Sequence, residues 1–159
     1  MSTQIRNYHM LGKLAGEFEV TELREHVTVT NENVTEVYEH NAAPWAKTMG
    51  LTEFKVGRGT ASALLPQNPA LQWANGAICG QAIMAAIDTV VSLAMFTADR
   101  ATKGTASQNT QFLRPASGDD LRIEANVLKF GSVIAYAEAR VTFVSSGKLV
   151  AHSTAEFVF

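Results

Sequence analysis

One apolar run with a single charge constrains this chain more than any other feature. Residues 75–98 read NGAICGQAIMAAIDTVVSLAMFTA, and Asp88 is the only charged side chain between Arg58 and Asp99. The run is nearly long enough for a membrane helix. However, a carboxylate near the bilayer centre costs about 2.5 kcal/mol or more, and the flanks show no bias of Lys or Arg. We therefore expect the buried central helix of a soluble domain.

The composition favours one globular domain over residues 1–159. Hydrophobic residues make up 47% of the chain and charged residues 18%, which is enough for a sizeable core. The net charge of -2 offers no basic surface for nucleic acid or for an anionic membrane. The single cysteine excludes an internal disulfide and, with no signal-peptide pattern at the start, indicates a cytoplasmic location. The scattered histidines lack the spacing of metal ligands.

Strand patterns occupy most of the chain outside the apolar run. Segments 121–130, 133–144 and 149–159 alternate apolar and polar residues and are joined by short turns, which predicts an antiparallel meander. Alanines dominate the apolar face of 133–144 and leave room for the central helix. Segments 51–56 and 60–66 flank a glycine turn and predict a hairpin. The expected fold class is α+β, a curled antiparallel sheet wrapped around one long helix.

The segment before the hairpin predicts two short helical pieces. Thr30 or Asn31 is suited to cap a helix that ends near His40. Pro44 then begins a second turn that Gly50 closes.

Asp88 belongs to a narrow polar stripe on the central helix. At 100° per residue, Gln81, Asp88 and Ser92 point in similar directions. Burying a carboxylate costs free energy, so a functional role for Asp88 is favoured. It could be a general base, a nucleophile or a hydrogen-bond acceptor for a ligand. The alternative is a buried acid that is hydrogen-bonded to the sheet or covered by a partner chain.

The expected start of the helix, from Gly76 onward, offers a second element of a site. Asn75-Gly76 and Gly80 leave the backbone accessible where the first helical N–H groups lack partners, so this end can hold an anion or a developing oxyanion. The alternative is that Gly80 only permits close helix–sheet packing. If the first reading holds, the N–H donor and Asp88 should face one cavity.

Several stretches resemble a known family. PWAKTMGL, NGAICGQAIMAAIDT, TASQNTQFLRPA and the closing strands are similar to hotdog-fold acyl-CoA thioesterases of the phenylacetic-acid-degradation (PaaI-like) type. That family carries a glycine, two residues, His-Gly-Gly, and an acid nine residues after the histidine. Here Cys79 follows Gly76 at that spacing and Asp88 stands nine residues further on. The resemblance covers 44–159, implies the hotdog fold and leaves 1–40 as an extension.

The resemblance implies roles for particular residues. Asp88 takes the place of the base or nucleophile, and the Gly80 N–H takes the oxyanion position. Thr105 matches a water-positioning hydroxyl that the neighbouring subunit supplies in some relatives. Asn109 matches a polar strand position without a defined role. Lys129, beside the turn at Gly131, is a candidate contact for CoA phosphates.

The chain departs from the family pattern around the helix start. Cys79 replaces the histidine, Gln81 replaces the second glycine, and Trp73 stands where some relatives have a water-orienting asparagine. We expect these residues, with Asn75, to border the substrate. Bulky apolar residues are candidates for the wall of an apolar or aromatic acyl pocket; they are Trp45, Met49, Trp73 and Met84.

The expected activity is hydrolysis of an acyl-CoA thioester by a homodimer or homotetramer. It needs no metal or bound cofactor, since coenzyme A is part of the substrate. One alternative is a non-catalytic acyl-CoA or lipid-binding protein that kept the pocket. Another is a hydratase or dehydratase, which the sequence disfavours because no histidine lies near the motif that carries Asp88.

Overall fold

The computed structural model describes residues 27–159, which form one six-stranded antiparallel sheet around a long helix. The strands follow the order β1-β2-β4-β5-β6-β3, so β1 and β3 are the two edges. The helices are α1 (Val34–Asn41), α2 (Pro44–Lys47), the 3-10 turn η1 (Pro69–Leu71) and α3 (Gly80–Met95). The strands are β1 (Thr52–Gly57), β2 (Thr60–Leu65), β3 (Gly104–Phe112), β4 (Leu121–Phe130), β5 (Ile134–Phe143) and β6 (Leu149–Val158).

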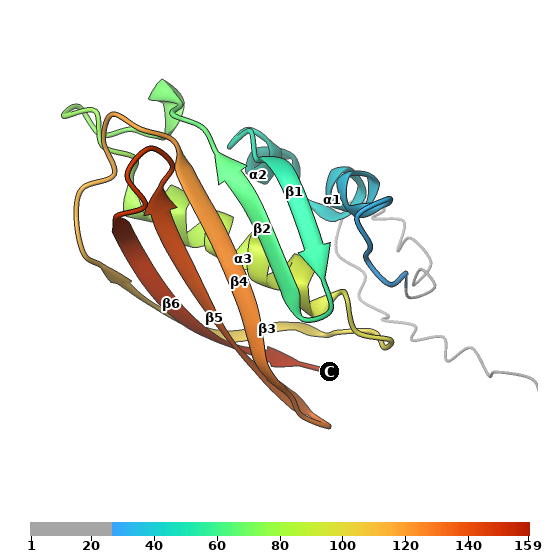
Figure 1. Cartoon of the computed structure of the whole chain (residues 1–159). Helices are drawn as coiled ribbons and strands as arrows, with labels where there is room; N and C mark the ends of the chain where they lie inside the picture. Colours follow the sequence, from blue (N-terminus) through green and yellow to red (C-terminus); the bar gives the residue numbers. More distant parts are fainter. Residues whose placement is uncertain (1–26) are drawn as a thin grey trace, which may run out of the picture.

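The sheet curls around α3, which lies against its concave face (Figure 1). The most deeply buried helix residues include Ala86, Ile87 and Val90, each 0% exposed. Small side chains on the facing strands leave space for the helix, as Ala135, Ala137 and Ala139 of β5 do. The predicted α+β fold with a meander of β4, β5 and β6 is therefore confirmed.

The central helix begins later than the sequence suggested. Gly76 has a φ of +81°, a conformation that belongs to a turn rather than a helix. The next residues pair with neighbouring loops, since Ile78 N donates to Ala116 O at 3.0 Å and Cys79 N to Leu71 O at 2.8 Å. The helix therefore begins at Gly80, not Gly76, and it ends at Met95.

The two predicted pieces before the hairpin are present. Helix α1 begins at Val34, later than expected, because Thr30 N donates to Asn33 Oδ1 at 2.8 Å and holds the preceding turn out of the helix. Helix α2 begins at Pro44, as predicted. Val29 N donates to Phe96 O at 3.0 Å, which ties the chain before α1 to the end of α3.

Membrane insertion through a helix finds no support among residues 27–159. No helix there is long and apolar enough to cross a bilayer.

Candidate active site

The acid of the central helix is paired with a hydroxyl from the sheet. Thr105 Oγ1 donates to Asp88 Oδ1 at 2.5 Å. After α3 ends, the chain turns back and enters β3 at Gly104, which brings Thr105 alongside the middle of the helix. The hydroxyl comes from the same copy of the chain as the acid. This hydrogen bond orients the carboxylate.

Asp88 lies at the junction of two cavities. The larger, about 780 Å³, lies between α1, α3 and the start of β3. The smaller, about 320 Å³, lies between α1, α2 and α3 and is lined mainly by apolar side chains. Residues that line both cavities are Val37, Asn41, Asp88, Ser92 and Phe96. Asp88 is half-buried, so it borders open space rather than sitting sealed in the core.

A third cavity, about 550 Å³, lies at the other end of the helix. Gly80 lines it together with Asn75, Trp73 and Phe112. Gly80 is the first residue of α3, where backbone N–H groups lack partners within the helix. A Cβ at Gly80 would come within 3.1 Å of Phe112 Cζ. The glycine therefore serves close packing and also borders a cavity.

One copy of the chain does not bring Gly80 and Asp88 to the same cavity. Eight residues of helix separate them, which is about 12 Å along the axis. Asp88 lines the first two cavities and Gly80 lines the third. The expectation that donor and base face one cavity is thus wrong for a single copy.

The remaining residues predicted near the helix start are spread over different environments. Gln81 is exposed, whereas Asp88 and Ser92 line a cavity, so the expected stripe of three is reduced to two. Cys79 is half-buried against the core. Asn75 Oδ1 accepts from Ala77 N at 3.1 Å and shapes the turn before the helix.

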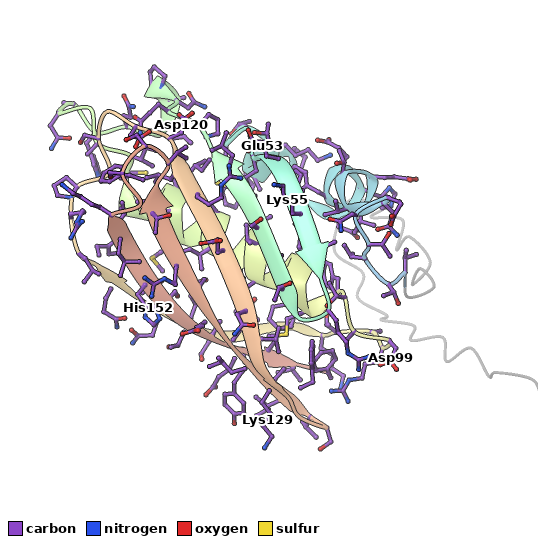
Figure 2. The ribbon with its side chains drawn as sticks, viewed as in Figure 1. Glu53, Lys55, Asp99, Asp120, Lys129 and His152 are labelled. Carbon is purple, nitrogen blue, oxygen red and sulfur yellow. The ribbon has the colours of Figure 1, made fainter. Side chains whose placement is uncertain are left out.

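Two predicted polar residues lie away from Asp88. Asn109 of β3 is exposed, and its side chain accepts a hydrogen bond from Gln111. Lys129 is exposed near the end of β4, at the far tip of the β4–β5 hairpin (Figure 2).

The predicted pocket residues fall into three groups. Trp45 lines the smaller cavity beside Asp88, and Trp73 lines the cavity at Gly80. Met84 is exposed on α3. Met49 is only 1% exposed and belongs to the core, so its assignment to a pocket wall is wrong.

Sequence reasoning missed the ionisable groups that α1 contributes. His40 and Glu36 line the same cavity as Asp88, and Lys103 joins them from the connection before β3. His40 is 48 residues from Asp88 in the chain, so no motif spacing links the two. A histidine outside the motif therefore borders the same cavity as the acid.

Comparisons with known proteins agree with this fold. A model of the thioesterase superfamily matches residues 75–149, the segment that contains Gly80, Asp88 and Thr105. A conserved protein from Pseudomonas aeruginosa is similar in structure, with 26% identity and a TM-score of 0.69, over 76% of this chain and 96% of that one. No curated protein matches the sequence.

Two further structures share the fold at lower identity. The PaaI protein of the Escherichia coli phenylacetic acid degradation operon is 22% identical, with a TM-score of 0.71, over 80% of this chain and 90% of that one. Zebrafish thioesterase superfamily member 2 is 18% identical, with a TM-score of 0.72, over 82% of this chain and 99% of that one. The chain has the hotdog fold, and its residues 75–149 are similar to the thioesterase superfamily.

Proposed function

We propose that this protein is a PaaI-like acyl-CoA thioesterase in which Asp88 performs the chemistry. The observation that carries the proposal is the Asp88–Thr105 pair at the junction of two cavities, inside the segment that matches the thioesterase superfamily. A carboxylate oriented by a hydroxyl and open to a cavity is equipped to act as a general base or a nucleophile.

The complete site is proposed to form between two copies of the chain. Strand β3 is an edge of the sheet, and several of its residues are exposed, including Thr105, Ser107 and Asn109. An edge strand of nine residues presents backbone N–H and C=O groups that can pair with another strand. Association through this edge and the neighbouring face of α3 would bring Gly80 of one copy toward Asp88 of the other. The self-association is therefore part of the catalytic proposal.

The reaction is proposed as follows. The thioester carbonyl oxygen accepts from the Gly80 N–H, which stabilises the negative charge that develops on that oxygen. Asp88 either takes a proton from an attacking water or attacks the carbonyl carbon itself. The C–S bond then breaks, and coenzyme A leaves with the electron pair on sulfur. Neither route requires a metal or a resident cofactor.

The smaller cavity is proposed to hold the acyl group. Trp45, Leu93 and Phe96 give it a mainly apolar wall next to Asp88. At about 30 Å³ for each non-hydrogen atom, a volume comparable to that of a water molecule, its 320 Å³ accommodates a single aromatic ring or a medium-length chain. The single cysteine supports a reducing, cytoplasmic location.

The test is a panel of acyl-CoA esters of different length and aromaticity, with a thiol reagent to detect released coenzyme A. Wild-type protein should hydrolyse at least one member, and Asp88→Asn should lose about 100-fold or more of kcat. Asp99→Asn, at an exposed acid after α3, is the matched control and should behave as wild type. Full activity of a folded Asp88→Asn variant would exclude the mechanism. Tight acyl-CoA binding by calorimetry without turnover would instead identify a binding protein.

A further inference from the structure

The larger cavity is a groove between α1 and α3 with a reactive group on each wall. On α3, Asp88, Ser92 and Phe96 line it at intervals of four residues, which places them on one face of the helix. On α1 the lining residues also share a face, and the residue before the helix, Asn33, joins them; those on the helix are Glu36, Val37, His40 and Asn41. A histidine and the proposed catalytic acid therefore border the same space.

Helix α1 is oriented so that its C-terminal end, which carries His40, lies nearer the middle of α3 than its beginning does. The hydrogen bond from Val29 N to Phe96 O fixes the chain before α1 at the end of α3. Four residues that follow α1 line the smaller cavity together with Ala85 and Thr89; they are Ala42, Ala43, Trp45 and Ala46. Helix α1 thus runs antiparallel to α3. The helical rise from Asn33 to His40 is about 10 Å, and the rise from Phe96 back to Asp88 is about 12 Å, so the two segments are similar in length.

Four ionisable side chains from residues 27–159 face this groove: Glu36, His40, Asp88 and Lys103. Lys103 Nζ already donates to Phe159 O at 3.0 Å. Asp88 receives the Thr105 hydroxyl. Only the imidazole has an ordinary pKa close to neutral, so only it readily both donates and accepts a proton under physiological conditions.

We propose that His40 donates a proton to the departing sulfur of the thioester hydrolysed at Asp88. This inference rests on the proposed function. As the C–S bond breaks, its electron pair goes to sulfur, and the imidazolium N–H proton transfers there, giving the free thiol and neutral imidazole. The proton that Asp88 gains from water, in the direct route or on hydrolysis of an acyl-aspartate, returns to the imidazole. Both groups end as they began.

The test compares His40→Gln with His152→Gln on two thioesters of the same acyl group. His152 is the matched control because it lies on β6, pairs with Glu138 at 3.4 Å and points away from the groove, on the open face of the sheet (Figure 2). One substrate is the acyl-CoA, whose alkyl thiol needs a proton on departure. The other is an ester of an aryl thiol, which leaves readily as the anion.

His40→Gln should lower kcat on acyl-CoA by about 100-fold with little change in KM, and should lower it by less than tenfold on the aryl ester. His152→Gln should match wild type on both substrates. Equal losses on the two substrates, or no loss on either, would overturn the role of His40 while leaving the proposed function intact. Failure of wild-type protein to hydrolyse any thioester would instead overturn the proposed function.

Discussion

Gly80 and Asp88 lie on the same helix, eight residues apart, yet they open onto different cavities. The rise of an α-helix separates them by about 12 Å, which is too far for both to contact one carbonyl group. If both act on the thioester, two copies of the chain must each supply one of them. The proposed mechanism therefore requires self-association.

The role of the Gly80 N–H is tested by removing that group alone. Gly80→Pro deletes the N–H at the first position of the helix, where proline is well tolerated, and Cys79 already has the extended backbone that precedes proline. We expect kcat to fall by about 100- to 1000-fold with an unchanged far-ultraviolet circular dichroism spectrum.

Gly80→Ala is the control for this change because it keeps the N–H. Its Cβ would press on the exposed ring of Phe112, 3.1 Å away at Cζ, and the ring has room to shift. The alanine variant should keep most of its activity. Equal losses in the two variants would mean that Gly80 serves packing only.

The Thr105 hydroxyl should matter to activity more than to folding. Thr105→Val removes the donor to Asp88 Oδ1 and keeps the shape of the side chain. A hydrogen bond to a charged group contributes about 1.5–3 kcal/mol, so kcat should fall by roughly tenfold or more. Thr105→Ser retains the hydroxyl and should remain close to wild type. Steady-state kinetics on the preferred acyl-CoA would measure both, and a fully active valine variant would remove Thr105 from the site.

A pH-dependent stability effect is expected at the turn between β5 and β6. Asp119 Oδ2 accepts from Ser145 Oγ at 2.6 Å and from Ser145 N at 2.9 Å. These bonds hold the pKa of Asp119 below its usual 3.8. Because the folded state favours the ionised form, the contribution is present above the ordinary pKa and is lost as the pH falls through the lowered value.

Asp119→Asn should accordingly lower the midpoint of urea unfolding at pH 7, and the difference from wild type should shrink toward pH 3. Ser145→Ala should show the same trend, since it removes the partner hydroxyl. A difference that is constant across this pH range would contradict the assignment of the stabilisation to the ionised carboxylate.

The fold was predictable from the sequence because its two main signals are local. Period-two alternation defined the strands of the meander, and the alanines at 135, 137 and 139 indicated room for a helix against the sheet. The exact start of that helix was not predictable. It depends on pairing of residues 77–79 with segments that are distant in the chain, such as Ala116, and on the positive φ of Gly76.

The candidate site was predictable only where one motif contained it. Asp88 and Gly80 follow from the helix pattern and the family resemblance. The resemblance also singled out Thr105, but as a hydroxyl from the neighbouring subunit, whereas here it contacts Asp88 of its own chain. His40 could not be found, because its place beside this cavity depends on how α1 lies relative to α3. Met49 was misassigned because a bulky apolar residue suits a core and a pocket wall equally, and the structure places it in the core.

The central claim is that Gly80 of one copy and Asp88 of another act on the same thioester. Its most direct test mixes two inactive variants, Gly80→Pro and Asp88→Asn, by co-expression or by unfolding and refolding together. A mixed dimer contains one site with both groups intact, so random pairing predicts that activity recovers to about one quarter of the wild-type value. Activity no greater than that of either variant alone, with mixed dimers demonstrated by differential tags, would contradict the account.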